Sequence, residues 1–171
     1  LHLRKIITMK NLLKVLLVAF IILQFFRIDK TNPPVDKKMD FLTIKKTPEN
    51  LSKMIKSACY DCHSNETVYP WYANVQPFGW FLKDHIDEGR RELNFSTFAT
   101  YEPLRQAKKL NKAAKEVKEG EMPLESYLLM HKEAKLNLEQ KELLVTYLLT
   151  MKDITMMQNG ISEEELKPKQ K

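Results

Sequence analysis

Two cysteines and one histidine form the chemically distinctive group of this sequence. The chain of 171 residues contains two cysteines, Cys59 and Cys62, and His63 follows the second one directly. In a Cys-x-x-Cys-His arrangement, two thiols can add to the two vinyl groups at one edge of a porphyrin. The histidine is then placed beneath the iron and can bind it through Nε2. The spacing therefore predicts one covalent haem c, attached by Cys59 and Cys62, with His63 as its proximal iron ligand.

Other chemistries of a Cys-x-x-Cys pair fit this sequence less well. A structural zinc site usually needs four ligands, often from a second Cys-x-x-Cys pair or a His-x₃₋₅-His motif, and neither is present in the chain. A thioredoxin-like pair follows a strand in a βαβ unit, whereas a helical pattern precedes Cys59. A disulfide between Cys59 and Cys62 in an oxidising compartment stays an alternative, and would make the protein an interaction domain without haem.

The second axial position of the iron has several candidate ligands, namely Met122, His131, His85 and Met130. Met122 follows a predicted helix stop at Gly120 and precedes Pro123, so an irregular backbone can turn it toward the iron. We therefore expect Met122 as the distal ligand. His131 is the alternative distal ligand, and it would give bis-histidine ligation with a lower reduction potential. An open or displaceable sixth position would instead make the protein a haem-based sensor or ligand-binding module.

The elements that position these residues are predicted to be helices. The chain has only 4 glycines and is rich in Lys, Glu, Leu and Ala, which favours an all-α fold. Thr47 and Pro48 resemble the start of a helix that leads to Cys59. Gly120 indicates a helix end, and Asn137 with Gln140 resembles a capping box. Expected helices cover residues 47–59, 78–92, 102–119 and 138–152, with an aromatic loop at residues 65–77.

The N-terminus has the layout of an export signal. Residues 15–26 are apolar except for Gln24, and basic residues precede them. We expect residues 1–28 to form an uncleaved membrane-anchor helix, counted from Ile6, followed by a linker at 29–46. The haem-binding domain then covers 47–152, and 153–171 form a flexible polar tail. The domain is expected in the periplasm, held at the inner membrane, or secreted to the periplasm if the signal is cleaved.

Charge is distributed unevenly along the chain. Residues 1–30 hold six basic side chains and one acid, whereas residues 31–171 hold 22 basic and 21 acidic ones. The overall charge of +6 therefore reflects membrane targeting rather than a nucleic-acid surface.

Several short motifs together resemble the bacterial haem-binding domain family, and class I cytochromes c more distantly. The motifs are CYDCHSN (59–65), YPWY (69–72), His85 with EGRRELNFS (88–96), EGEMP (119–123), Tyr127, and His131 with EAKL (133–136). The resemblance implies a small cytochrome c-like helical domain around one haem. It also implies that the first and last helices of the domain cross near Tyr147. Transferred position by position, it assigns Cys59 and Cys62 to attachment, His63 to the proximal side and Met122 to the distal side.

These observations favour a membrane-anchored monohaem protein that passes single electrons outside the cytoplasm. Its partners would be redox proteins, whose identity the sequence does not reveal, and no feature points to an oligomer. No phosphate loop, metalloprotease helix or nucleophile elbow is present, so we do not expect an enzyme. Arg90 or Arg91 is a candidate partner for a haem propionate. Expected walls of the haem are Tyr69, Trp71, Tyr72, Trp80 and Phe81.

Overall fold

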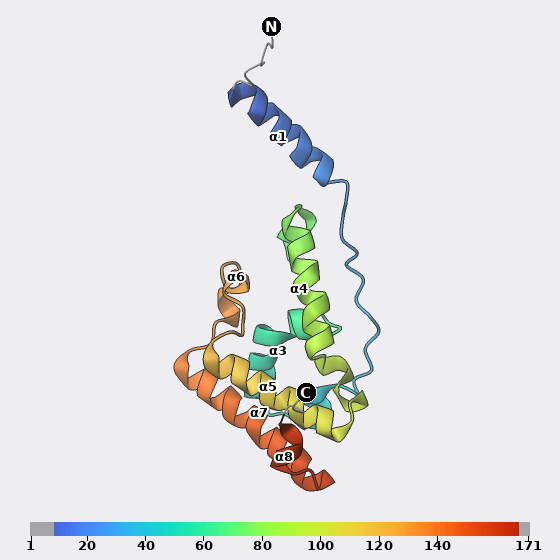
Figure 1. Cartoon of the computed structure of the whole chain (residues 1–171), viewed down its shortest axis with the longest axis vertical. Coiled ribbons are helices and arrows are strands. Elements are labelled where there is room, and N and C mark those ends of the chain that lie inside the picture. The colour runs from blue at the N-terminus through green and yellow to red at the C-terminus, as the bar shows by residue number, and fades with distance from the viewer. Residues whose placement is uncertain (1–8, 168–171) are drawn as a thin grey trace. The chain divides into compact units, whose positions relative to one another are not determined.

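A computed structural model describes residues 9–167, and every regular element in this part of the chain is a helix (Figure 1). The all-α prediction is therefore confirmed. The α-helices are α1 (Met9–Leu23), α2 (Phe41–Ile44), α3 (Glu49–His63), α4 (Phe78–Glu92), α5 (Pro103–Glu119), α6 (Glu125–Leu128), α7 (Leu138–Asn159) and α8 (Glu163–Leu166). Three 3₁₀ turns join them, η1 (Trp71–Asn74), η2 (Phe95–Thr100) and η3 (Lys132–Ala134).

The described residues form two compact units. The first contains residues 9–31 and 69–86, and the second contains residues 32–68 and 87–167. Helix α4 contributes its N-terminal part to the first unit and its C-terminal part to the second. The Cys-x-x-Cys-His motif belongs wholly to the second unit.

Local capping signals explain several helix ends in the second unit. Helix α5 ends at Gly120, which adopts φ of 83° and so suits a residue without a side chain. Helix α7 begins with the expected capping box of Asn137 and Gln140. It continues past the predicted end at residue 152, because Thr155 and Met156 are buried, and it stops at Gly160 with φ of 64°. The residues expected to form a flexible tail thus include the end of α7 and helix α8.

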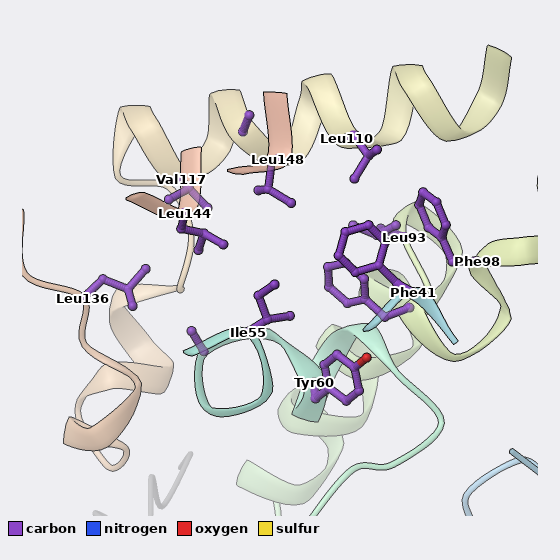
Figure 2. Close-up of a cluster of buried hydrophobic side chains, with 13 residues drawn as sticks. Phe41, Ile55, Tyr60, Leu93, Phe98, Leu110, Val117, Leu136, Leu144 and Leu148 are labelled. Atoms are coloured by element: carbon purple, nitrogen blue, oxygen red, sulfur yellow. The ribbon is translucent and has the colours of Figure 1, made fainter. Parts of the chain in front are cut away.

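The core of the second unit lies between α3, α5 and α7 (Figure 2). Ile55 of α3, Leu110 of α5 and Leu144 of α7 are almost fully buried. Burying one such side chain contributes about 1.5–3 kcal/mol. Helix α7 packs along α5, and η3 packs against α3. The core therefore fixes α3, whose last turn carries the haem motif.

Tyr147 has a different role from the predicted helix crossing. Its ring meets Phe41 of α2 edge-on, with centroids 6.3 Å apart. Its hydroxyl lies 2.7 Å from Oγ1 of Thr47, the residue before the N-cap of α3. Tyr147 therefore connects α7 to the entrance of α3, while the main partner of α7 is α5.

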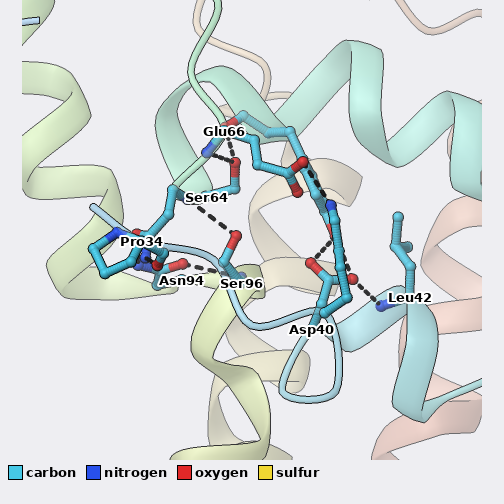
Figure 3. A network of polar contacts seen from close by, with 10 residues as sticks. Pro34, Asp40, Leu42, Ser64, Glu66, Asn94 and Ser96 are labelled. Carbon is cyan, nitrogen blue, oxygen red and sulfur yellow. Dashed lines mark hydrogen bonds and ion pairs between the residues drawn. The ribbon is translucent and has the colours of Figure 1, made fainter. Parts of the chain in front are cut away.

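Residues 32–46, most of the segment expected to form a linker, are built into the second unit (Figure 3). Phe41 is fully buried, and Asp40 caps α2 by accepting a hydrogen bond from the Leu42 amide at 2.9 Å. The Tyr60 hydroxyl donates to the Asp40 carboxylate at 3.0 Å. Asn65 donates to the Pro34 carbonyl at 3.0 Å. The prolines and lysines of this segment suggested a spacer, but one buried aromatic ring and these hydrogen bonds hold it in place.

The first unit connects the end of α1 to the start of α4. The Gln24 amide donates to the Gln76 carbonyl at 3.1 Å and accepts from the Gln76 backbone N–H at 2.9 Å. The indole N–H of Trp80 donates to the Phe26 carbonyl at 2.8 Å. No residue of α1 is buried.

The predicted membrane span differs from the helix observed. Among residues 9–167, no helix has both the length and the apolar character needed to cross a bilayer, and α1 has 15 residues. The predicted span was counted from Ile6, which lies outside the described residues.

Candidate functional site

The last turn of α3 carries Cys59, Cys62 and His63. Leu51, Ile55 and Ala58 form the buried face of this helix, so the core sets the direction of its final turn. Cys59 and Cys62 are free thiols with partly exposed side chains, and Cys59 also packs against the core. The structure therefore brings together the three residues that the sequence singled out as the haem motif.

His63 is oriented by two backbone carbonyls at the end of α4. Its Nδ1 lies 2.9 Å from the Gly89 oxygen and 3.0 Å from the Leu93 oxygen. Because both partners are acceptors, Nδ1 must carry the hydrogen, and in a neutral ring Nε2 then holds the lone pair. Burial lowers the pKa of His63, and the two carbonyls oppose this effect. Burial thus favours a neutral imidazole, the form in which histidine binds a metal.

Gly89 allows the close approach of α4 that makes these hydrogen bonds. A Cβ atom added at Gly89 would lie 2.6 Å from the Cys62 carbonyl oxygen, which is closer than van der Waals contact permits. Position 89 therefore requires glycine for packing. Sequence reasoning treated Gly89 only as part of a resemblance; a glycine inside a helix of a chain with 4 glycines was the available signal.

Both thiols are weak acids in this environment. Burial raises the pKa of Cys59 to about 12, with a smaller contribution from neighbouring Cys62. Burial also raises the pKa of Cys62 to about 11; Asp61 adds to this shift and Arg90 opposes it. The folded chain thus holds both sulfurs as protonated thiols at neutral pH.

Asp61, between the two cysteines, links the motif to two other segments. One carboxylate oxygen accepts the Val68 amide at 2.9 Å, and the other accepts the Tyr127 hydroxyl at 2.7 Å. The Asp61 carbonyl accepts a hydrogen bond from the Thr67 hydroxyl at 2.6 Å. The role of Asp61 was not predicted, because variable positions inside a Cys-x-x-Cys motif carry no chemical signal.

Both predicted distal ligands lie in the segment between α5 and α7. Met122 is partly buried and packs against the core of the second unit. His131 stacks on Tyr127 with ring centroids 4.1 Å apart, and its Nδ1 lies 3.0 Å from Glu133. The Tyr127–Asp61 hydrogen bond and the packing of η3 on α3 join this segment to the haem motif. Met122 and His131 stay predictions as iron ligands.

Arg90 is engaged within the protein. Its Nε donates to the Ser64 carbonyl at 2.8 Å, and its Nη2 contacts Asn32 Oδ1 at 2.8 Å and Thr67 Oγ1 at 3.0 Å. These hydrogen bonds connect the end of α3 to the segment before α2. Arg90 thus ties these segments together, and a propionate contact of Arg90 or Arg91 stays a prediction. The expected haem-wall aromatics all lie in residues 69–81, within the first unit.

The residues present fit a haem of the c type. Two thiols on one helical turn are followed by a neutral imidazole whose Nδ1 hydrogen is already bonded, which is the arrangement that orients a metal-binding histidine. Across residues 9–167, no three His, Cys, Asp or Glu side chains gather in a way that would hold a bare metal ion. The two thiols and the adjacent imidazole themselves suit attachment of a porphyrin and binding of its iron.

Comparison with known proteins agrees with this chemistry. No curated protein and no solved structure shows significant similarity to the chain. The haem-binding domain family matches residues 18–150, which is more than half of the chain and includes the Cys59–His63 motif and both distal candidates. On this match, and with a site whose donors fit haem, the protein is a member of the haem-binding domain family.

Proposed function

We propose that this protein carries one haem c, bound covalently through Cys59 and Cys62, and transfers single electrons outside the cytoplasm. The observation that carries the proposal is the pair of hydrogen bonds from His63 Nδ1 to the Gly89 and Leu93 carbonyls. They fix the imidazole tautomer and its orientation beside two free thiols. A bound haem would supply a one-electron iron couple at this place.

Attachment needs no oxidant or reductant. Each thiol adds across one vinyl group: the sulfur forms a C–S bond and the thiol hydrogen goes to the neighbouring carbon. The two cysteines thus become thioethers and can no longer form a disulfide. His63 contributes its Nε2 lone pair, and the Gly89 and Leu93 carbonyls keep the ring from rotating.

The segment between α5 and α7 is proposed to supply the sixth ligand. The Tyr127–Asp61 hydrogen bond ties this segment to the haem motif, which supports a ligand from Met122 or His131. Met122 is the preferred ligand and would raise the reduction potential, as expected for an electron carrier. His131 is the alternative.

Export and membrane attachment complete the proposal. Residues 15–23 of helix α1 are all apolar, no residue of α1 is buried, and basic residues precede the apolar run. Thioether formation requires delivery to a compartment where haem c is attached, and the N-terminus has the layout of an export signal. We therefore place the domain in the periplasm, attached to the inner membrane through α1.

Mass spectrometry of the intact chain tests covalent attachment. Matured in a host that attaches haem c, the protein is expected to gain the mass of one haem. The gain should persist in acid and denaturant and disappear in Cys59→Ser/Cys62→Ser. A chain lighter than the reduced protein by two hydrogens would show a disulfide instead and would overturn the proposal.

Absorption spectra test the distal ligand. Met122→Ala is expected to remove the long-wavelength band of methionine–iron ligation, whereas Leu129→Ala, a control at an exposed position of the same segment, should keep it. Loss of the low-spin spectrum only in His131→Ala would assign the ligand to His131. A high-spin wild-type protein that binds CO when reduced would favour a ligand sensor over an electron carrier.

A further inference from the structure

The first unit carries a group of exposed aromatic side chains at the junction of η1 and α4. We name this group the aromatic tip and define it as Trp71, Phe78, Trp80 and Phe81. Trp71 is 69% exposed, Phe78 60%, Phe81 57% and Trp80 38%. Large apolar side chains scattered singly on a surface are ordinary, but four exposed aromatic ones within residues 71–81 of one unit are an unusual concentration.

The local structure holds the aromatic tip together. Trp71 lies in η1, and the other three side chains lie in the first turns of α4. The two elements are in tight contact, because a Cβ atom at Gly79 of α4 would lie 2.5 Å from the Ala73 carbonyl oxygen of η1. Gln76 is fully buried between them and accepts a hydrogen bond from the Trp80 amide at 3.1 Å. The exposed rings therefore stand on a rigid base.

The same base is joined to the end of α1. Gln24 makes two hydrogen bonds with the Gln76 backbone, and Trp80 donates to the Phe26 carbonyl. Lys30 donates to the Asn74 side chain at 2.7 Å. The aromatic tip thus lies at the C-terminal end of a helix whose large apolar side chains, such as Leu13 and Leu17, are 59% exposed.

We propose that the aromatic tip docks into the lipid headgroup region of the membrane that α1 enters, and so forms a second membrane contact of the protein. Tryptophan and phenylalanine at the end of an apolar helix suit the membrane interface, where rings bury an apolar body and the indole N–H meets polar groups. In residues 24–31 and 69–86 of this unit, the cations Arg27, Lys30 and Lys83 outnumber the acids Asp29 and Asp84, a balance that suits anionic lipids. The inference rests on the proposed membrane attachment through α1, and is independent of haem attachment.

Tryptophan fluorescence of the full haem-loaded chain tests this contact. The chain has only 2 tryptophans, both in the aromatic tip, and Trp80→Phe leaves Trp71 as the single emitter. This variant is reconstituted into equimolar phosphatidylcholine and phosphatidylglycerol vesicles, with bromine atoms placed either near the headgroups or near the chain ends. Since emission is compared between brominated and unbrominated vesicles, quenching by haem cancels.

Trp71 is expected to be quenched roughly twofold more by bromines near the headgroups, since interfacial aromatic rings lie at that depth. In the same background, Phe78→Ser/Phe81→Ser should reduce this quenching. The matched control Leu138→Ser, which removes a side chain 73% exposed in the second unit, should not.

Three results would overturn the inference. Flotation with the vesicles distinguishes failure of the tip contact alone from failure of the membrane anchor. Chains that float with vesicles but whose Trp71 is quenched by aqueous acrylamide and not by brominated lipid would retain the anchor and refute the tip contact. Chains that do not float would refute both. A concentration-dependent emission shift in detergent without vesicles would show that a second copy covers the tip. Mass spectrometry of the haem attachment stays a separate readout throughout.

Discussion

At the scale of single residues, Gly89 decides how α4 meets the haem motif. Gly89→Ala is expected to destabilise the folded protein by about 1–3 kcal/mol, the usual cost of overpacking a well-packed contact. The new Cβ would collide with the Cys62 carbonyl and push the Gly89 carbonyl away from His63. Urea unfolding of the haem-loaded protein measures the change. The neighbouring substitution Glu88→Ala, at an exposed position, is the control, and equal stability of the two variants would contradict this account.

The two thiols give a prediction about pH. A raised pKa means fewer thiolates at any given pH, and only the thiolate is a good nucleophile. Near about pH 8, Cys62 in the folded, haem-free chain should react with iodoacetamide at least about a hundredfold more slowly than in the urea-unfolded chain. Its rate should rise until the pH reaches its pKa of about 11. Equal rates in both states would show that the thiols are not shielded.

The low reactivity of both thiols in the folded chain also bears on whether haem is attached before or after folding. If both sulfurs are protonated and packed near the core, thioether formation is easier before α3 closes onto its neighbours. We therefore expect haem to be attached to the unfolded or partly folded chain.

The sequence alone predicted the three attachment residues, because their spacing is specific. It did not predict their shielding, which depends on which distant side chains pack around them.

At the scale of elements, the Tyr127–Asp61 hydrogen bond joins α3 to the segment between α5 and α7, which carries Met122 and His131. Tyr127→Phe is expected to lower the free energy of unfolding by about 1 kcal/mol, as for one lost hydrogen bond. It should also weaken the sixth iron ligand, because the segment carrying Met122 and His131 loses a tie to the haem motif. Tyr147→Phe is the matched control, since it loses a hydrogen bond to Thr47 elsewhere in the second unit.

The two variants separate a positioning role from simple stability. Both variants should unfold at a lower urea concentration than the wild-type protein. Only Tyr127→Phe should change the absorption band of the sixth ligand and the alkaline pH at which half of that band is lost. If both variants keep the wild-type spectrum, the Tyr127–Asp61 bond does not position the distal ligand. If both alter it, the effect follows from reduced stability.

The elements also show where sequence reasoning succeeds and where it stops. Helix ends governed by short-range signals were predicted, as at Gly120 and at the Asn137 capping box. Interactions between distant residues were not: the composition of residues 29–46 suggested a spacer, while Phe41 is buried and Asp40 bonds Tyr60. The packing of α7 along α5, rather than across the first helix of the domain, likewise depends on contacts that no local pattern encodes.

At the scale of the whole molecule, the separation of charge predicts how the haem meets its partners. Residues 31–171 hold 22 basic and 21 acidic side chains, so the part of the chain that carries the haem motif has almost no net charge. Long-range steering of a charged partner depends on net charge and on clusters of one sign, and salt screens it over about 10 Å at 0.1 M. We expect electron exchange with small charged reagents to depend weakly on ionic strength.

Stopped-flow oxidation of the reduced protein measures this directly, with anionic ferricyanide and cationic tris(phenanthroline)cobalt(III) as oxidants. For each reagent, the rate should change by less than about threefold when ionic strength rises tenfold, because a near-neutral surface has little field to screen. A steep salt dependence of opposite sign for the two reagents would reveal a local charged patch beside the haem. The natural redox partner would then carry the opposite charge to this patch, since association is steered by complementary potentials. Arg4, Lys5, Lys10 and Lys14, the basic residues before the apolar run, should not contribute in vesicle-bound protein, because their expected site is the opposite, cytoplasmic side of the membrane.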